Sequence, residues 1–189
     1  MIFFKKFKKF LFLTLLFPGL LAKAQVAPAV RGGGWSLSAG AGFSSFQPDW
    51  GRARHFGPEA FFDFDLKPKY GAEGEARWMH WNGNGGGNMQ SSNYLLGPRY
   101  RVYKWNKFSF YGKFMMGAGL ITYPANIGAS GSYFAYAPGG TVSYRISRRF
   151  SVRGDYEYEF WPSAPNIPGV PNHGLTPHGF SLGFAYKIF

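Results

Sequence analysis

The sequence predicts an all-β fold, an eight-stranded antiparallel up-and-down transmembrane β-barrel, and three observations lead to it. First, the 189 residues include 21 Phe, 12 Tyr, 6 Trp and 27 Gly but only 16% charged residues. This composition suits a chain with one face in lipid and excludes a disordered one. Second, eight segments alternate bulky apolar residues with small or charged ones at period two. Third, their connections alternate between short basic turns and longer loops, as in barrels of an outer membrane.

The first 24 residues have the pattern of a cleaved signal peptide. Four lysines precede an apolar stretch over 11–21, and Ala22 and Ala24 supply small side chains at the cleavage-determining positions. The stretch is well short of the roughly 20 residues that a membrane-spanning helix needs. The expected organisation is therefore a signal peptide at 1–24, a short N-terminal segment at 25–32 and a barrel at 33–189.

The first four expected strands each gather apolar residues on one face. The apolar sets are Trp35, Leu37, Ala39, Ala41 and Phe43 in 33–46; Phe56, Ala60, Phe62, Phe64 and Leu66 in 55–66; Tyr70, Ala72, Ala76 and Trp78 in 70–82; and Tyr94, Leu96, Tyr100 and Val102 in 92–104. The opposite faces are rich in Gly, Ser and charged residues, and Phe61 is one bulky residue among them. This alternation predicts strands that separate two different environments.

The last four expected strands repeat the pattern. Their apolar sets are Phe108, Phe110, Phe114, Met116 and Leu120 in 107–121; Phe134, Tyr136, Val142, Tyr144 and Ile146 in 132–146; Phe150, Val152, Tyr156, Tyr158 and Phe160 in 149–161; and Phe180, Leu182, Phe184, Tyr186 and Ile188 in 178–189. The segment 149–161 alternates most regularly. Three short connections, at 67–69, 104–107 and 147–149, and four longer ones, at 47–54, 83–91, 122–131 and 162–177, join the eight strands.

The volume of the apolar sets indicates which face lies outside. Eight strands enclose an interior just wide enough for side chains. Eight sets of Phe, Tyr and Leu would overfill that interior, whereas the Gly-, Ser- and Ala-rich faces fit it. We therefore expect the apolar face to meet lipid. A secreted soluble barrel, with the apolar face inward, is the alternative.

The expected inward face carries charges of both signs. They are Glu59, Asp63, Asp65, Glu73, Glu75, Arg77, Arg99, Arg101, Lys113, Arg145, Arg153, Asp155, Glu157, Glu159 and Lys187. Burying an unpaired charge in a narrow interior carries a desolvation penalty of roughly several kcal/mol. The near balance of eight acids and seven bases therefore predicts a network of ion pairs that plugs the lumen. A solvated strand face is the alternative interpretation.

One choice of register gives this network specific pairs. If Trp81 lies opposite Asn93, antiparallel pairing forms two cross-strand ion pairs, Glu75–Arg99 and Glu73–Arg101. The turn at 67–69 also sets Asp63 near Glu73, and this like-charged pair needs Arg99 or Arg101 between its members.

Two prolines fall inside expected strands. Pro98 and Pro138 lack the N–H group that a strand donates to its neighbour. We expect bulges or irregular pairing at both positions.

The remaining bases do not indicate nucleic-acid binding, despite a net charge of +12. Five lysines lie in the expected signal peptide, and most others lie in the short turns, at Lys67, Lys69, Lys104, Lys107, Arg148 and Arg149. No basic face can be separated from the barrel pattern. These residues are expected to be solvated turn residues, and contact with anionic lipid headgroups is the alternative.

No residue pattern predicts catalysis, a metal or a cofactor. The chain has no cysteine, and of its four histidines only His80 and His178 have outward parity. Neither has an outward serine two residues away, as a lipid-hydrolysing dyad at the membrane surface would need. The glycine-rich segment 82–88 lacks the lysine and following helix of a phosphate-binding loop. We expect a protein that is not an enzyme.

Together these features resemble the small OmpA-like and OmpX-like outer-membrane β-barrel family. The stretches 94–100 and 150–158 look like strands of such proteins. The resemblance implies an outer-membrane location, with outer-membrane lipids and the barrel-insertion machinery as partners. In that family a C-terminal Phe, with an aromatic residue two positions before it, is read by that machinery. Here Phe189 follows Tyr186 by three positions, so the implied insertion signal is shifted.

The expected function is that of a structural or interaction barrel, which contributes to envelope integrity or contacts a surface partner through its long loops. A small-conductance channel or a barrel that binds an apolar ligand is the alternative. The loops 83–91, 122–131 and 162–177 contain no Lys, Arg, Asp or Glu. This composition disfavours electrostatic capture of charged solutes.

Overall fold

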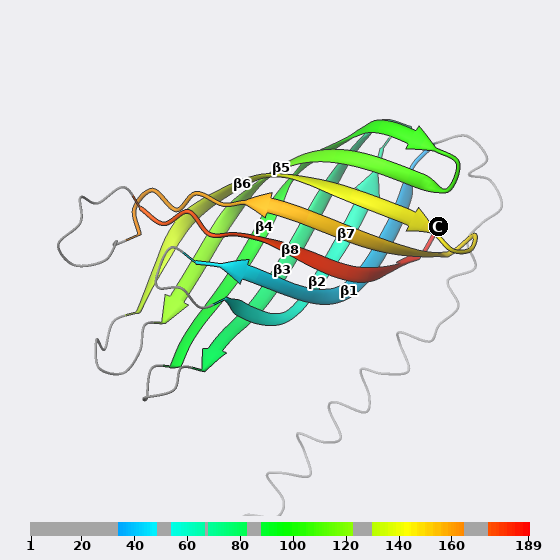
Figure 1. The fold of residues 1–189 in the computed structure, drawn as a ribbon. Coiled ribbons are helices and arrows are strands. Elements are labelled where there is room, and N and C mark those ends of the chain that lie inside the picture. The colour runs from blue at the N-terminus through cyan, green and yellow to red at the C-terminus, as the bar shows by residue number, and fades with distance from the viewer. Residues whose placement is uncertain (1–33, 49–53, 67, 83–87, 123–129, 165–173) are drawn as a thin grey trace, which may run out of the picture. The chain divides into compact units, whose positions relative to one another are not determined.

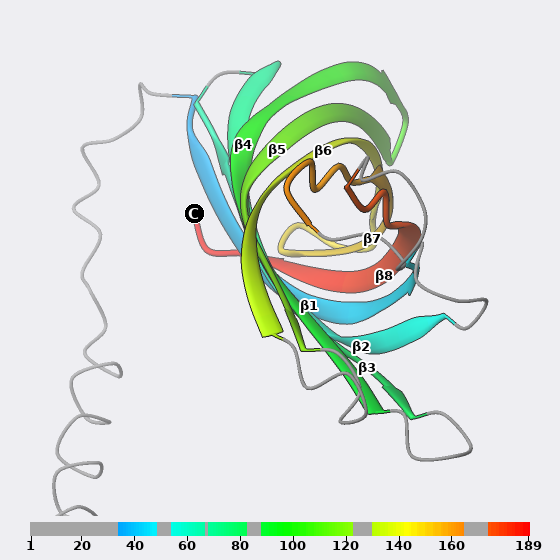
Figure 2. The same ribbon diagram turned by 90° about the vertical axis from the view of Figure 1, so that its left-hand side faces the viewer.

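The chain folds into a closed barrel of eight antiparallel strands (Figure 1). The computed structural model describes residues 34–48, 54–66, 68–82, 88–122, 130–164 and 174–189. The strands are β1 (Ser36–Gln47), β2 (His55–Asp65), β3 (Tyr70–Asn82), β4 (Asn88–Trp105), β5 (Phe108–Thr122), β6 (Ser130–Arg145), β7 (Phe150–Tyr158) and β8 (His178–Lys187). Each pairs with the next, and β8 pairs with β1 to close the ring seen in Figure 2. The predicted fold class is confirmed.

The predicted strands agree with the observed ones to within a few residues, except that β4 begins earlier, at Asn88, and β7 ends earlier, at Tyr158. The expected signal peptide, 1–24, and the segment 25–32 lie outside the described residues. No helix in the described ranges is long and apolar enough to cross a bilayer.

The two ends of the barrel differ. One end, here called the turn end, holds the short connections 66–69, 106–107 and 146–149 and the last residue of β8. The other, the loop end, holds the connections after β1, β3, β5 and β7. This division is the predicted one, and it is typical of outer-membrane barrels.

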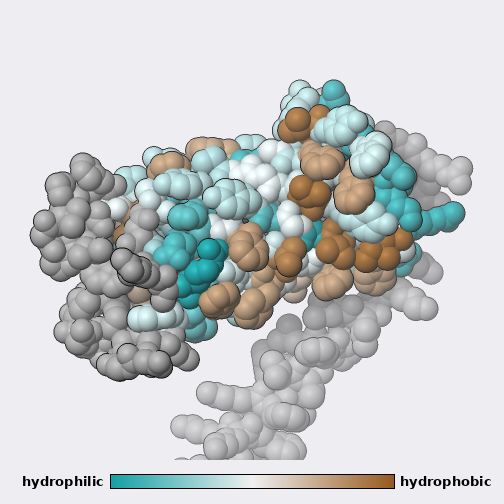
Figure 3. Space-filling view, in the orientation of Figure 1, coloured by the Kyte–Doolittle hydropathy of each residue, from teal (hydrophilic) through white to brown (hydrophobic). Residues whose placement is uncertain are grey.

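The outward face is apolar and aromatic. Phe184 and Leu182 of β8 expose 65% and 61% of their surface, and Leu96 of β4 exposes 55%. Hydrophobic side chains cover much of the visible exterior in Figure 3. So large an apolar surface is unfavourable in water, and lipid is the solvent that accommodates it. The predicted assignment of the two faces is therefore confirmed, and the soluble barrel is excluded.

The predicted register between β3 and β4 is wrong by four residues. Trp81 lies opposite Met89, not Asn93, because β4 begins at Asn88, inside the expected loop, and only 83–87 connect the two strands. Glu75 consequently lies opposite Leu95, and Glu73 lies opposite Gly97. The two proposed cross-strand ion pairs do not form. Between β2 and β3, in contrast, Asp63 lies opposite Glu73, as expected.

The prolines interrupt pairing without shifting the register. Between β4 and β5 the partners Leu96–Met116 and Arg99–Lys113 share one register, and the pairing is missing at Pro98 between them. Between β6 and β7 the continuous pairing ends at Gly139, next to Pro138. The expected irregular pairing is therefore seen at both prolines, but without a bulge, and the register shift in β4 lies at Arg101–Tyr103.

Closure of the ring predicts heat-dependent mobility on a gel. In SDS without boiling, the protein is expected to stay folded and to migrate differently from the boiled sample, because opening the barrel exposes two strand edges at once. Leu182 lies in β8 and pairs with Phe43 of β1 and Gly154 of β7. Leu182→Pro removes an N–H group from this seam, so we expect it to abolish the shift. Leu182→Ala, which shortens the same side chain but keeps the N–H group, is expected to retain it; equal behaviour of the two variants would contradict the closed seam.

Candidate functional site

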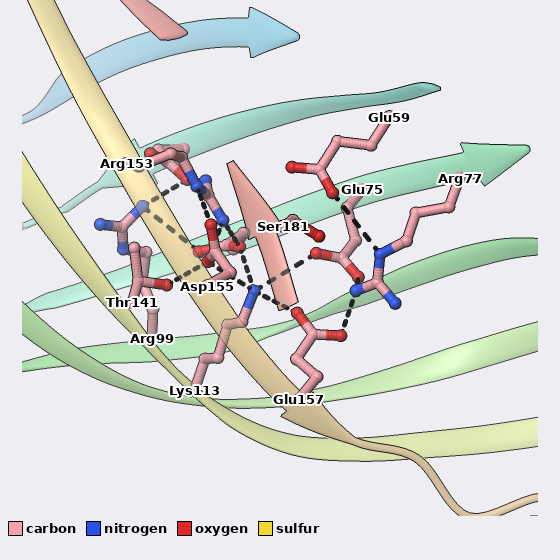
Figure 4. Close-up of polar contacts among 12 residues, drawn as sticks. Glu59, Glu75, Arg77, Arg99, Lys113, Thr141, Arg153, Asp155, Glu157 and Ser181 are labelled. Carbon is pink, nitrogen blue, oxygen red and sulfur yellow. Dashed lines mark hydrogen bonds and ion pairs between the residues drawn. The ribbon is translucent and has the colours of Figure 1, made fainter. Parts of the chain in front are cut away.

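The lumen contains a network of buried ion pairs (Figure 4). Twelve of the fifteen predicted lumenal residues take part in it: Glu59, Asp63, Asp65, Glu73, Glu75, Arg77, Arg99, Lys113, Arg153, Asp155, Glu157 and Glu159. All of them except Asp65 are buried. Inward and outward positions alternate along each strand, so the inward positions of β2, β3 and β7 bring several carboxylates and guanidinium groups into the same narrow space.

Arg77 of β3 is the cation nearest the loop end in this network. Its Nη1 lies 2.6 Å from Oε1 of Glu159, and its Nη2 contacts both Glu75 and Glu157. Its Nε lies 3.7 Å from Oε2 of Glu59. A single guanidinium thus faces four carboxylates, and its side chain is 1% exposed.

Lys113 of β5 occupies the middle of the network. Its Nζ lies 2.8 Å from Oε1 of Glu73, 3.0 Å from Oδ1 of Asp155 and 3.3 Å from Oε2 of Glu75. It also contacts Glu157. Because Glu75 and Glu157 touch Arg77 as well, the two cations share their carboxylates and form one continuous cluster.

Arg153 of β7 and Arg99 of β4 extend the cluster towards the turn end. Nη2 of Arg153 lies 2.5 Å from both Oε1 of Glu73 and Oδ1 of Asp155. Arg99 contacts Asp63, and its Nη1 lies 3.4 Å from Oε2 of Glu73. Arg99 therefore stands between the like-charged Asp63 and Glu73, the position for which the sequence suggested Arg99 or Arg101.

Three of the four cations also lie against an inward aromatic ring. The guanidinium carbon is 4.4 Å from the Phe46 ring for Arg77, 3.9 Å from the Phe61 ring for Arg153 and 3.8 Å from the Tyr111 ring for Arg99. A ring face attracts a cation and needs no hydrogen bond. The Phe61 ring covers Gly40, where a Cβ atom would come within 2.3 Å of it, so the small residue makes room for the stack.

An apolar cluster, here called the cap, lies near the loop end of the barrel. It comprises Met89, Leu95, Met115, Ile121, Ala135, Ala137, Trp161, Ala164 and Leu175. Trp161 is 2% exposed, and its indole Nε1 donates to Oε2 of Glu159 at 2.7 Å. Since Glu159 also binds Arg77, this carboxylate joins the cap to the ion-pair network.

Sequence reasoning did not identify the cap. Trp161 follows the end of β7, where a backbone pairing with Leu175 continues the strand for one residue. The sequence did contain one indication of the position of Trp161. It lies two residues after Glu159 and four after Glu157, so in an extended strand its side chain lies on the same inward face as theirs. A Cβ atom at Gly119 would lie 2.5 Å from the indole, so this glycine gives the ring its place.

Three predicted lumenal bases lie apart from the network. Arg101, Arg145 and Lys187 contact no carboxylate among the described residues, and Arg145 and Lys187 are exposed. They have inward parity but lie close to the turn end, where water reaches them. The expected balance of eight acids and seven bases is therefore wrong for the ion pairs, which join eight acids to four bases.

The histidines form no open catalytic site in the described part of the chain. His80 is exposed, as its outward parity predicts. His55 is 2% exposed, and its Nδ1 lies 3.3 Å from Oγ of Ser91. These two residues line a cavity of only about 10 Å³, which has no room for a substrate. His173 lies outside the described residues, and the described ones contain no group of three or more potential metal ligands.

The two residues of the expected insertion signal present their rings on the surface. Tyr186 is 38% exposed and Phe189 is 50% exposed. The Tyr186 ring packs on Phe150, and the Phe189 ring packs edge-on against Trp35. Phe189 thus joins the aromatic exterior although it lies out of phase with Tyr186.

Comparison with known proteins gives a consistent result. The model of the outer membrane protein beta-barrel domain family matches residues 11–187. No curated protein sequence matches significantly. Ail, the attachment invasion locus protein of Yersinia pestis, solved in complex with the heparin analogue sucrose octasulfate, is similar in structure with a TM-score of 0.55 and 18% identity, over 82% of this chain and 99% of that one.

Two further solved structures resemble this barrel. Neisserial surface protein A has a TM-score of 0.63 and 13% identity, over 84% of this chain and all of that one. The outer membrane protein OprG from Pseudomonas aeruginosa has a TM-score of 0.56 and 11% identity, over 82% of this chain and 97% of that one. At such low identity these likenesses concern the fold.

Proposed function

The chain belongs to the outer membrane protein beta-barrel domain family, whose model matches most of it, and is an outer-membrane protein; from this we propose that it is a sealed, non-enzymatic barrel. In this proposal it contributes to envelope integrity and contacts a surface partner at its loop end. The turn end faces the periplasm, as both termini of an even-stranded barrel do. Tyr186 and Phe189 serve as the signal for the barrel-insertion machinery.

One observation carries the sealing proposal. Glu159 accepts hydrogen bonds from both Arg77 and Trp161, so the charged and the apolar fillings of the lumen are in contact with each other. An ion that crossed the barrel would have to break the network and also displace the cap. Both are costly, because one leaves buried charges unpaired and the other opens a packed core.

The residues favour a structural role over catalysis. The buried His55–Ser91 contact adjoins a cavity that no substrate could enter. At the loop end, the segments 83–91, 122–131 and 162–177 carry no charged residue. At these three segments a surface partner would be recognised through apolar contacts and neutral hydrogen bonds, unlike a heavily sulfated ligand such as the one bound to Ail. The fourth loop-end connection, after β1, differs because it carries Asp49, Arg52 and Arg54.

A barrel that binds an apolar ligand is the second candidate, and one feature favours it. A groove of about 730 Å³ lies in the barrel wall over β1 to β5. Small residues, including Ala39, Ala60 and Ala76, line it, and Phe62 and Leu96 are among the larger ones. A hydrocarbon chain of the surrounding lipid is the simplest occupant of such a surface.

Planar-bilayer recording tests the sealing proposal. We expect the wild-type barrel to show no steady conductance, because two barriers lie in series along its axis. Two variants each remove one barrier. Trp161→Ala opens the cap but keeps the ion-pair network, whereas the charge-balanced double variant Arg77→Ser and Glu157→Ser disrupts the network but keeps the cap. We expect both variants to show no steady conductance. The combination of all three changes is expected to conduct. Steady current through wild-type protein would instead support the small-conductance channel.

A further inference from the structure

A polar cavity lies at the turn end, in the mouth of the barrel. It has a volume of about 220 Å³ and is lined by inward residues of β1, β2, β4, β5, β6, β7 and β8 together with the turn between β6 and β7. A water molecule occupies about 30 Å³ in the liquid. The cavity thus has room for a small solute in addition to water.

The lining of this mouth is strongly basic. Its cations are Arg99, Arg101, Arg145, Arg148, Arg149 and Lys187, and its only carboxylates are those of Asp63 and Asp65. Both carboxylates are already within ion-pair distance of Arg99. Among the described residues, the other five cations have no carboxylate within 4.0 Å. The mouth therefore has an uncompensated positive charge.

The mouth also offers hydrogen-bond donors. Six serines and Tyr111 line it in addition to the arginines. Arg99 is only 4% exposed, and its buried Nε has no hydrogen-bond partner in the described part of the chain. The nearest acceptor in an ion pair with this atom is Oδ1 of Asp65, at 3.7 Å, which is too far for a hydrogen bond. An unused buried donor therefore lies at the wall of a basic cavity.

We propose that this mouth binds a small soluble anion that carries a phosphate group. Guanidinium groups bind phosphate oxygens in a paired, planar geometry, and hydroxyl groups donate to the same oxygens. A dianion would compensate charges that no protein carboxylate meets. The mouth lies inside the ring of strands, whereas lipid headgroups surround its outer rim, so a soluble phosphate ester or diphosphate fits better than a lipid. On the proposed orientation the ligand would come from the periplasm, but the site itself depends on the mouth geometry and not on the sealed lumen.

Titration calorimetry of the refolded barrel in a zwitterionic detergent, with inorganic pyrophosphate as the probe, tests this site. We expect saturable binding of one pyrophosphate per chain. The mouth variant Arg101→Gln, Arg145→Gln and Lys187→Gln is expected to bind at least about 10-fold more weakly, because it removes three charge-assisted contacts and 1.4 kcal/mol is tenfold. The matched control is Lys69→Gln, Lys104→Gln and Lys107→Gln, which removes three turn-end cations that do not line the mouth, and it is expected to stay within about 2-fold.

Three results would overturn the proposal. Absence of saturable binding, or an equal loss in the control variant, would show only general attraction of an anion to a basic surface. Competition by nanodiscs that contain phosphatidylglycerol, lost in the mouth variant, would assign the site to a lipid headgroup instead of a soluble anion. Retention of the heat-dependent gel shift in both variants confirms that each is folded, so a failure of binding is distinguishable from a failure of the barrel.

Discussion

Replacing Arg77 with Met is expected to destabilise the barrel more than any other single change in the network. The guanidinium faces Glu59, Glu75, Glu157 and Glu159, and its removal leaves these carboxylates facing one another in a space that water does not reach. Breaking a buried ion pair by removing one partner costs about 3–5 kcal/mol. The whole network joins eight carboxylates to four cations, so no spare cation is available to replace it. Urea titration of the barrel refolded in lipid vesicles measures the change in the free energy of unfolding.

Arg101→Met is the matched control for this experiment. Arg101 also has inward parity but contacts no carboxylate among the described residues, so its loss is expected to change the free energy of unfolding by no more than about 0.5 kcal/mol. A second variant tests the cause. Adding Glu157→Gln to Arg77→Met removes one of the buried negative charges that the loss of Arg77 leaves facing one another. We therefore expect the double variant to regain part of the free energy of unfolding. Equal effects of Arg77→Met and Arg101→Met would mean that the network contributes nothing to folding.

The alternation of residues was sufficient to predict the fold and the two faces. A period of two fixes which side chains share a face, and eight such segments with alternating turn lengths leave few other arrangements. Alternation does not fix the position of one strand along the next. The β3–β4 register depended on how much of 83–91 was loop, and β4 extends into this segment as far as Asn88.

Ion-pair partners across the lumen are harder to predict than the face on which they lie. Arg77 and Glu157 meet although they are 80 residues apart and their strands are not neighbours. Parity also says nothing of height along the barrel axis. This is why Arg101, Arg145 and Lys187, which share the parity of Arg99, lie in the wider mouth instead of the network.

The inward aromatic residues show the same limit. The argument from volume placed bulky rings outside, and it holds for most of them. Phe46, Phe61 and Tyr111 fit inside because each lies flat against a guanidinium and so fills space that an arginine side chain leaves open. Their polar-face parity was visible in the sequence, but the stacking depends on residues from other strands.

Replacing Trp161 is expected to have the second-largest effect, and it separates packing from hydrogen bonding. Trp161→Ala opens a cavity in the cap, and such a change costs about 3–5 kcal/mol. Trp161→Phe keeps most of the packing but leaves Glu159 without its indole donor, which is expected to cost about 1–3 kcal/mol. Urea titration of both variants gives the two contributions. Trp81, which packs against the cap but is only partly buried, is the control, and Trp81→Ala is expected to cost less than Trp161→Ala. If Trp161→Phe and Trp161→Ala cost the same, the hydrogen bond to Glu159, and not the volume of the ring, is what holds the cap against the ion-pair network.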